Sequence, residues 1–264
     1  MQRIAVMGAG AIGCYYGGML ARAGREVTLI GRAQHVEAIR RGGLRFETKT
    51  FDERVRVQAS SEPQAVRDAE LILFCVKSQD TETAGAAIKP HVERDAAIVT
   101  LQNGVDNAER LAAVLGREVI PAVVYVAVEM AGPGHVRHHG RSELAIGRAA
   151  ASEAVATAFR AADVPIEISE NIAGVLWAKL IVNCAYNAFS AITQLPYGRL
   201  VEGEGVPAVM RDVVDECLAV ARAAGVQVSG DMHKAAERIA QTMPGQYSST
   251  AQDLARGKKT RSNT

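Results

Sequence analysis

A glycine-rich turn near the start of the chain is the feature that most restricts how it can fold. Residues 8–13 read GAGAIG, which fits the pattern G-x-G-x-x-G. The turn follows a short apolar run at residues 3–7, opens a segment with helical spacing, and precedes a second apolar run at residues 26–30. Because a dinucleotide-binding turn requires this succession of strand, turn, helix and strand, we predict a Rossmann-like unit here.

Each glycine of the turn has its own physical task in such a site. Gly8 permits the tight turn, Gly10 lets the backbone approach a pyrophosphate, and Gly13 lets the helix pack against the strand. The N–H groups and the positive dipole end of the helix favour the pyrophosphate. The predicted cofactor-binding residues of the turn are Gly8, Ala9, Gly10, Ala11, Ile12 and Gly13. The alternative is a glycine-rich turn that binds no ligand.

The end of the second predicted strand indicates which dinucleotide would bind. An NAD site usually carries Asp or Glu about 20 residues after the turn, where it binds the ribose hydroxyls. This chain has Ile30, Gly31 and Arg32 there. A guanidinium can bind a 2′-phosphate through two hydrogen bonds, so we expect NADP(H) rather than NAD(H). The alternative is that Arg32 is a solvated turn residue.

Strands and helices alternate over the first two thirds of the chain. The run LILFCV at residues 71–76 is continuously apolar, as in a parallel strand covered on both faces. From about residue 171 the pattern is helix after helix. We therefore predict an α/β protein, with a doubly wound Rossmann-like domain at residues 1–168 and an all-helical domain at 169–264. Residues 61–70 are expected to form a helix, and residues 135–147 a pair of antiparallel strands.

Composition restricts the partners and the setting. The chain has 30 basic and 29 acidic residues, so its net charge of +1 gives no electrostatic case for nucleic acid or an anionic membrane. An uninterrupted apolar run of about 20 residues, as a membrane helix needs, is missing. The four cysteines form no C-x-x-C pair, which indicates a reducing setting. We expect a cytoplasmic protein with no nucleic-acid or membrane partner.

Two further strand ends carry polar residues. Lys77 directly follows the run at 71–76, and Asn103 and Gly104 follow the predicted strand at 97–101. Ligands in open α/β sheets bind at the carboxyl ends of the strands, so we predict that both side chains contact the ligand. The alternative is that both are turn residues, since Asn-Gly is a common turn dipeptide.

A lysine and two amides interrupt the apolar segment 175–190. Lys179, Asn183 and Asn187 are spaced i, i+4 and i+8, which places them on one face of a helix. Burying an unpaired ammonium is costly, and a cleft between two domains would remove that cost. An ammonium there could protonate and stabilise the oxygen of a carbonyl that accepts a hydride. The alternative is a lysine that extends to the surface beside amides that pair helices.

Several stretches together resemble one known family, the ketopantoate reductases. The resemblance covers nearly the whole chain and rests on GAGAIG at 8–13, VKSQD at 76–80, QNGVDN at 102–107, LWAKLIVNCAYNAFSAI at 176–192 and SSTAQDLARGKKT at 248–260. It implies a Rossmann domain joined to a helical domain, with the active site between them. It also implies NADPH-dependent reduction of the 2-oxo group of ketopantoate, which gives pantoate for pantothenate and coenzyme A.

The resemblance implies a role for each substrate-side residue. Lys179 matches the proton donor, Asn183 and Asn187 match substrate-binding amides, and Ser249 matches a hydroxyl that binds the substrate carboxylate. Asn103 matches a residue that touches both cofactor and substrate. The implied catalytic residue is Lys179, and the implied partner is a small 2-oxo acid.

On the cofactor side, Arg32 matches the residue that binds the 2′-phosphate, and Lys77 matches one near the nicotinamide. A homodimer is the protein assembly considered. Two alternatives stay open for the function: a reductase of another 2-oxo acid, and an NADP-binding paralogue impaired in catalysis.

Two departures from the family pattern are expected to matter. Tyr197 stands where the family often carries Asn, so one substrate contact is in doubt. After residue 260 the family continues with an acidic residue that contacts the cofactor, whereas here residues 261–264 read RSNT. We expect a truncated or frame-shifted C-terminus, in which missing final helices would expose apolar surface of the helical domain.

Two other clusters do not suggest catalysis or metal binding. His135, His138 and His139 lie on a predicted strand without a carboxylate-bearing metal motif, so a solvent-facing strand is the better interpretation. Ser248 and Ser249 lack the partners of a catalytic triad. No metal is expected.

Overall fold

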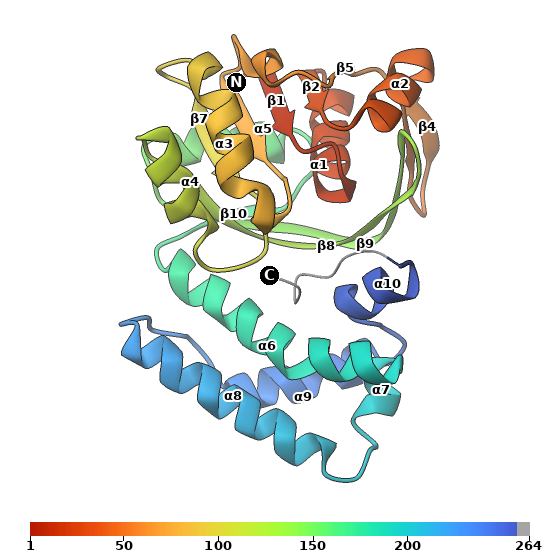
Figure 1. Ribbon diagram of the computed structural model, residues 1–264, viewed down its shortest axis with the longest axis vertical. Helices are drawn as coiled ribbons and strands as arrows, with labels where there is room; N and C mark the ends of the chain where they lie inside the picture. The colour runs from red at the N-terminus through yellow and green to blue at the C-terminus, as the bar shows by residue number, and fades with distance from the viewer. Residues whose placement is uncertain (258–264) are drawn as a thin grey trace. The chain divides into compact units, whose positions relative to one another are not determined.

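The computed structural model describes residues 1–257 and contains two compact units (Figure 1). The first unit spans Met1–Ile172 and the second begins at Ala173. This division lies a few residues beyond the one predicted between 168 and 169, because strand β10 (Ile166–Ser169) pairs with the sheet of the first unit.

The first unit is built on one sheet. Its other strands are β1 (Arg3–Met7), β2 (Glu26–Ile30), β3 (Leu44–Glu47), β4 (Asp52–Val55), β5 (Gln58–Ser60), β6 (Leu71–Phe74), β7 (Ala97–Thr100), β8 (Ile120–Gly132) and β9 (His135–Gly147). Nine of the ten strands follow the order β4-β3-β9-β8-β7-β6-β1-β2-β5, and the tenth, β10, pairs with β9 off this path. The neighbours from β5 to β8 are all parallel.

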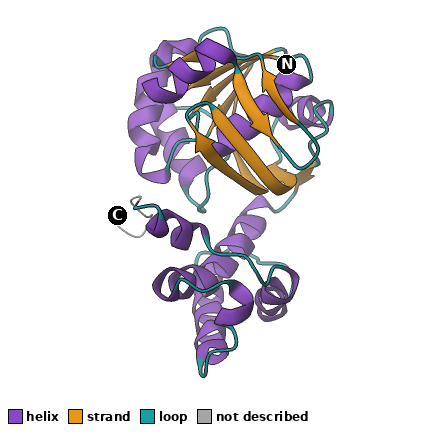
Figure 2. Ribbon diagram, turned by 90° about the vertical axis from the view of Figure 1, so that its right-hand side faces the viewer, coloured by secondary structure: helices purple, strands orange, loops and turns teal. Residues whose placement is uncertain are grey.

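Helices cover both faces of the parallel part (Figure 2). They are α1 (Ala11–Arg22), α2 (Ala33–Gly42), α3 (Thr81–Ile88), α4 (Asn107–Leu115) and α5 (Ser152–Arg160). One core cluster joins the sheet to α1, α2 and α5, and a second joins it to α3 and α4. Every residue of β6 and β7 is buried, because both faces of these strands are covered. The predicted doubly wound arrangement is confirmed.

The antiparallel part differs from the expectation. Residues 135–147 form the single strand β9, which pairs antiparallel with the equally long β8 (Figure 1). The prediction of two short strands was wrong because register shifts in the ladder absorb the irregular backbone at Gly140 and Arg141, both with positive φ. β3 and β4 form an antiparallel hairpin.

The helix expected over residues 61–70 is only the 3₁₀ turn Pro63–Val66, and its N-cap is Glu62. Proline at its start suits a first helical turn. The positive φ of Asp68 is incompatible with continuing a helix, which explains why the turn stays short.

The described part of the second unit is helical. Its helices are α6 (Ile172–Thr193), α7 (Tyr197–Leu200), α8 (Val206–Ala223), α9 (Met232–Thr242) and α10 (Ser249–Ala255). Their core contains Ile181 and Tyr186 of α6, Met210 and Val214 of α8, and Ala236 of α9. The predicted helical second domain is confirmed.

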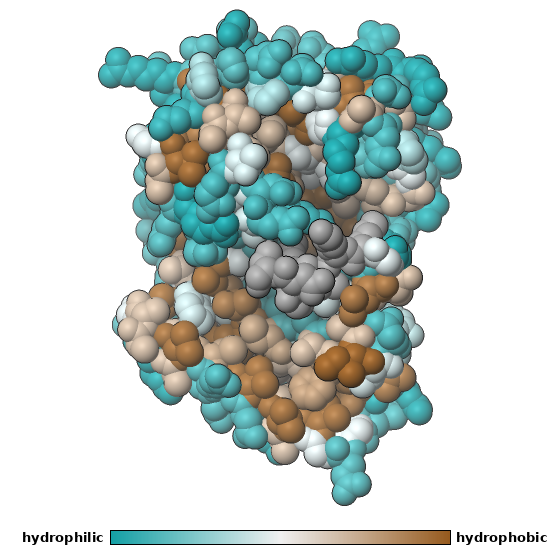
Figure 3. All heavy atoms as spheres, in the orientation of Figure 1, coloured by the Kyte–Doolittle hydropathy of each residue, from teal (hydrophilic) through white to brown (hydrophobic). Residues whose placement is uncertain are grey.

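Apolar side chains also gather on the surface of the second unit (Figure 3). The exposed large apolar residues among those described all belong to it: Ile192, Leu195, Val209, Val220, Tyr247 and Leu254. By length and composition α6 is the one described helix that could cross a membrane. However, it carries Lys179 and two amides along its length and contributes Ile181 and Ala185 to the core, so we assign it as the central helix of this unit.

Candidate active site

The glycine turn closes tightly on its neighbours. The N–H groups of Gly8 and Ala9 both donate to the carbonyl oxygen of Ile30, at 2.9 and 2.8 Å. Gly8 has φ +117°, and a Cβ on it would lie 2.6 Å from the carbonyl carbon of Cys75. Any larger residue would therefore force the turn away from the segment after β6.

The other two glycines of the motif differ in their surroundings. A Cβ on Gly13 would lie 2.2 Å from the Gly8 carbonyl oxygen and 2.8 Å from Val6 Cγ1, so this glycine allows α1 to pack on β1. A Cβ on Gly10 would meet nothing within 4 Å. Gly10 is also the N-cap of α1, and its helix start has no side-chain cap. The open space in front of uncapped N–H groups suits the pyrophosphate of a dinucleotide.

Arg32 lies two residues after the end of β2 and is the N-cap residue of α2, with its side chain exposed. Among the described residues it forms no ion pair with a carboxylate. Gly31 precedes it, and a Cβ there would lie 2.6 Å from the Cβ of Ala9. This glycine lets the Arg32 turn approach the GAGAIG turn. The sequence analysis did not assign this role to Gly31, although a glycine between a predicted strand and Arg32 could have indicated it.

The register of the sheet brings the glycine turn and three further predicted site residues to one edge. Met7 pairs with Ile30 of β2 and with Phe74 of β6, and Phe74 pairs with Thr100 of β7. The segments that follow these strands hold the glycine turn, Arg32, Lys77 and Asn103. They therefore share the carboxyl edge at which open α/β sheets bind their ligands.

Lys77 and Asn103 differ in exposure. Lys77 is exposed and precedes a 3₁₀ turn at Ser78–Asp80, while Asn103 is half-buried. Gly104 has φ +116°, a conformation that favours glycine, so the chain turns sharply after Asn103. Both residues lie in irregular segments at the carboxyl edge of the sheet, and their contact with a ligand stays a prediction.

A set of partly buried hydrogen bonds lies at the two segments, and the sequence analysis did not predict it. Ser78 Oγ donates to the Asn103 carbonyl oxygen at 3.2 Å, and Asn107 Nδ2 donates to the same oxygen at 2.9 Å. Gln102 Nε2 donates to the Val76 carbonyl oxygen at 3.1 Å. The available signal was a polar residue four positions after Asn103, at the start of an otherwise apolar helix face.

The thiols beside the glycine turn are not nucleophiles. Burial raises the pKa of Cys14 to about 12 and raises the pKa of Cys75 further above the usual range. Both thiols therefore stay protonated near neutral pH, and a thiolate mechanism does not fit this edge of the sheet.

In the second unit, Lys179, Asn183 and Asn187 lie on one continuous helix, α6, and each is half-buried. Their i, i+4 and i+8 spacing gives them a common face, as predicted. One face thus offers an ammonium and two amides, which can bind the oxygen atoms of a small acid.

The two neighbouring serines have different tasks. Ser248 is buried and caps α10, because its Oγ accepts from Ala251 N at 3.0 Å while its own N–H donates to Ser190 Oγ at 3.1 Å. Ser249 is the first residue of α10 and is exposed. Of the two serines, only Ser249 is exposed, and its contact with a substrate carboxylate stays a prediction.

Tyr197 belongs to the packing of the helical unit. Its ring lies 4.5 Å from the ring of Tyr186 between centroids, and burial raises its pKa to about 12. Tyr186 in turn donates from its hydroxyl to the Ala236 carbonyl oxygen at 2.7 Å. Tyr197 is therefore an uncharged aromatic residue that packs where an amide was expected from the family pattern.

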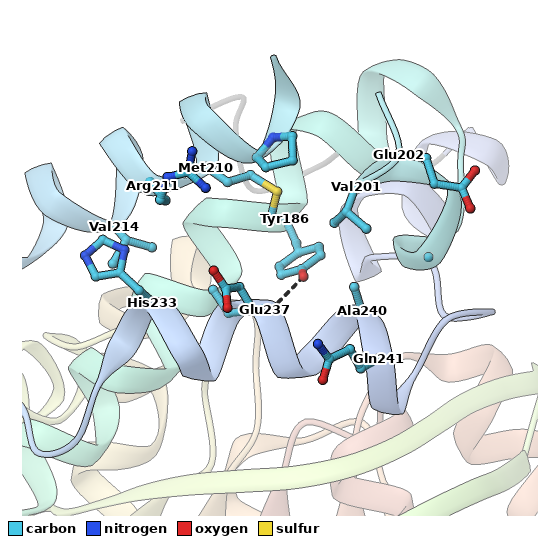
Figure 4. A pocket seen from close by; sticks show the side chains of 13 residues that line it. Tyr186, Val201, Glu202, Met210, Arg211, Val214, His233, Glu237, Ala240 and Gln241 are labelled. Atoms are coloured by element: carbon cyan, nitrogen blue, oxygen red, sulfur yellow. Dashed lines mark hydrogen bonds between the residues drawn. The ribbon is translucent and has the colours of Figure 1, made fainter. Parts of the chain in front are cut away.

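A cavity of about 420 Å³ lies beside this aromatic pair, between α7, α8 and α9 (Figure 4). Tyr186, Met210 and Val214 form much of its apolar wall, and Glu237 stands among its polar residues. None of the predicted substrate-binding residues lines it, so it is separate from the polar face of α6.

The three histidines are engaged in structural contacts. His135 Nε2 lies 2.8 Å from Glu47 Oε2, His139 Nε2 lies 3.1 Å from Glu129 Oε1, and the ring of His138 stacks on Tyr15. Among residues 1–257 no group of three or more potential metal ligands comes together. The predicted C-terminal truncation at residues 261–264 lies outside the described residues.

Comparisons with known proteins cover both units. Residues 4–151 match the family described as Ketopantoate reductase PanE/ApbA, and residues 171–262 match its C-terminal domain. A 2-dehydropantoate 2-reductase of Halobacterium salinarum is 36% identical over 271 residues, which is 98% of this chain and 88% of that protein.

Two solved structures are also similar to this chain. A PanE/ApbA family ketopantoate reductase from Ralstonia eutropha JMP134 superposes with a TM-score of 0.95 at 64% identity, covering 98% of this chain and 87% of that one. A D-mandelate dehydrogenase, solved with NADH and anilino(oxo)acetate, shares the fold at a TM-score of 0.90 and 23% identity, with 98% and 87% covered. The chain therefore belongs to the ketopantoate reductase family of oxidoreductases.

Proposed function

We propose that this protein reduces the 2-oxo group of 2-dehydropantoate (ketopantoate) to the hydroxyl of pantoate with NADPH, in the cytoplasmic biosynthesis of pantothenate and coenzyme A. The observation that carries the proposal is the polar face of α6, where Lys179, Asn183 and Asn187 share one side of an apolar helix. The 2-dehydropantoate 2-reductase with 36% identity supports the choice of substrate.

The first unit fits a dinucleotide. Gly10 leaves open space before the uncapped start of α1, and Gly8 and Gly13 hold the turn closed. The residues that would hold the cofactor are Gly8, Ala9, Gly10, Ala11, Ile12, Gly13, Arg32, Lys77 and Asn103. When bound, the reduced nicotinamide supplies the hydride.

The choice of NADPH over NADH depends on the end of β2. Ile30 and Gly31 offer no carboxylate for ribose hydroxyls, and the exposed Arg32 guanidinium has no carboxylate partner among the described residues. A guanidinium in this state is available to a 2′-phosphate.

The second unit supplies the proton. As the carbonyl carbon of the substrate gains a hydride, its oxygen gains negative charge, which the Lys179 ammonium would stabilise before it transfers a proton from Nζ to that oxygen. Asn183 and Asn187 would bind the substrate, and the Ser249 hydroxyl would bind its carboxylate. The neutral amine left on Lys179 then regains a proton from water.

The test is NADPH consumption by the full chain with 2-dehydropantoate and with a panel of other 2-oxo acids. We expect the highest kcat/KM for 2-dehydropantoate. A higher value for another 2-oxo acid would reassign the substrate, and NADPH binding without turnover of any acid would show a binding protein impaired in catalysis. The partner we propose is thus a small 2-oxo acid, with no nucleic-acid or membrane partner, and light scattering of the purified chain would test for a homodimer.

A further inference from the structure

Four polar side chains are almost completely removed from solvent beneath the ligand edge of the first unit. Their exposed fractions are 0% for Thr81, 3% for Thr100, 7% for Gln102 and 3% for Asn107. Such burial costs free energy unless every polar group finds a partner. The hydrogen bonds made by these four side chains show where that cost is offset.

Gln102 lies at the centre of the group. Its Nε2 donates to the Val76 carbonyl oxygen at 3.1 Å and to Thr81 Oγ1 at 2.8 Å, while its Oε1 accepts from Thr100 Oγ1 at 2.8 Å. Both ends of the amide are used, so its orientation is fixed. Because Val76 directly precedes Lys77, Gln102 ties the backbone before that lysine to the end of β7.

Thr81 connects the two segments that follow β6 and β7. Its hydroxyl accepts from Gln102, and its own proton faces the Ser78 carbonyl oxygen at 2.9 Å and Asn107 Oδ1 at 3.2 Å. Asn107 Nδ2 then donates to the Asn103 carbonyl oxygen at 2.9 Å. The chain of bonds therefore begins one residue before Lys77 and ends on Asn103 itself.

Two further contacts support the same connection. Ser78 Oγ donates to the Asn103 carbonyl oxygen at 3.2 Å, and Arg110 Nη2 donates to the Ser78 carbonyl oxygen at 3.0 Å. A Cβ on Gly104 would lie 2.8 Å from Asn107 Nδ2, so the glycine leaves room for that amide. The two segments are thus joined directly at their tips as well as through the buried group.

A network of this kind is weak evidence for stability, since apolar side chains of the same shape could fill the space without needing partners. Apolar side chains, however, form no directional bonds and could not hold two irregular segments at a fixed separation in this way. The two segments joined here carry the residues proposed to meet the nicotinamide end and the substrate.

We infer that Thr81, Gln102 and Asn107 are positioning residues, which hold the Lys77 and Asn103 segments as one body and so set the distance between the two ligand-contacting side chains. This inference rests on the proposed function, because the tasks of Lys77 and Asn103 come from it. None of the three residues needs to touch cofactor or substrate to exert this effect.

The experiment compares Thr81→Val with Thr81→Ser in the full chain. Valine keeps the shape and removes the hydroxyl, while serine keeps the hydroxyl and loses a packed methyl group. We expect Thr81→Val to lower kcat/KM for 2-dehydropantoate roughly tenfold and Thr81→Ser to stay within about twofold of the parent, although both lower Tm. Thr157→Val is the control for the loss of a hydroxyl alone, because it removes a hydroxyl that donates to a helix carbonyl at an exposed position on α5.

A double-mutant cycle with Asn103→Ala separates positioning from general destabilisation. If Thr81 acts through Asn103, the loss caused by Thr81→Val becomes about twofold or less once Asn103→Ala is present. Additive losses, or equal losses in Thr81→Val and Thr81→Ser, would overturn the inference.

Amide hydrogen exchange gives a readout that does not depend on turnover. We expect Thr81→Val to speed exchange in peptides that cover residues 76–80 and 103–107 together, and Thr81→Ser to leave both at the parental rate. Parental exchange in the valine variant would refute the connection between the segments. If the parent chain does not reduce 2-dehydropantoate, the proposed function is refuted. The exchange rates would still show whether the two segments move as one body.

Discussion

At the scale of single residues, two cations carry different parts of the proposed reaction. Lys179 lies half-buried on an apolar helix, where removing an ammonium from water costs free energy. Arg32 is exposed, as most arginine side chains are, so its proposed role as the 2′-phosphate ligand is inferred only from its position after β2. The first is proposed to affect the chemical step and the second the choice of cofactor.

Lys179→Ala should lower kcat by about 10² to 10⁴-fold, because it removes the proton donor and the charge that stabilises the developing oxyanion. The Kd for NADPH, measured by fluorescence titration, should stay within about twofold of the parent, since the glycine turn and Arg32 are untouched. Unchanged turnover would remove Lys179 from the mechanism.

Arg32→Ala should raise the Kd for NADPH by tenfold or more, which corresponds to the loss of one or two charge-assisted hydrogen bonds worth about 1.5–3 kcal/mol. The Kd for NADH should hardly change, because NADH has no 2′-phosphate. Arg56→Ala, which removes another exposed arginine of the same unit, serves as the control. Equal losses for both cofactors in Arg32→Ala would contradict the assignment.

At the scale of elements, the glycine turn must both pack tightly against its neighbours and leave open space for a ligand. Gly13 is needed for packing, because a Cβ there would overlap the Gly8 carbonyl oxygen at 2.2 Å. Gly10 is needed for open space, because nothing lies within 4 Å of a Cβ there. These surroundings agree with the separate tasks that the sequence analysis gave the two glycines, packing for Gly13 and open space for Gly10.

Alanine at each position should therefore give opposite results. Gly13→Ala should lower the free energy of unfolding by about 1–3 kcal/mol through overpacking, seen as a lower Tm. Gly10→Ala should leave Tm nearly unchanged, because its φ of −88° suits alanine, yet weaken NADPH binding by crowding the pyrophosphate. Parental affinity for NADPH in Gly10→Ala would argue against a pyrophosphate at this turn.

The pairing of β3 with β9 should depend on pH. Hydrogen bonds from Arg137 and, to a lesser extent, His135 hold the pKa of Glu47 below its usual value of 4.5. A carboxyl with a lowered folded-state pKa stabilises the fold fully above its usual pKa, and this stability is lost as the pH falls through the lower value.

Thermal unfolding between pH 7 and pH 3 would test this contribution. The parent should lose Tm steeply below about pH 4.5, the usual pKa. Glu47→Gln should start from a lower Tm at neutral pH and lose less of it on acidification. Glu37→Gln, at an exposed position on α2, should follow the parent. Identical acid profiles for Glu47→Gln and the parent would show that this carboxylate does not contribute.

At the scale of the whole molecule, the two-unit organisation followed from sequence patterns that repeat over many residues. Alternating strand and helix signals gave the doubly wound unit, and the uninterrupted helical signals after residue 171 gave the second unit. The length of β9 was missed, because the ladder with β8 continues through positions that are unfavourable for an isolated strand, such as Gly140.

The sequence by itself determined the features that depend on neighbours along the chain: the glycine turn after β1, Arg32 at the end of β2, and the shared face of Lys179, Asn183 and Asn187. These follow from strand and helix periods, which are local properties of the backbone. Only the tertiary structure decided which segments meet. The bonds among Thr81, Gln102 and Asn107 join residues up to 26 positions apart, and such partners are chosen by how the strands pair and not by any local pattern.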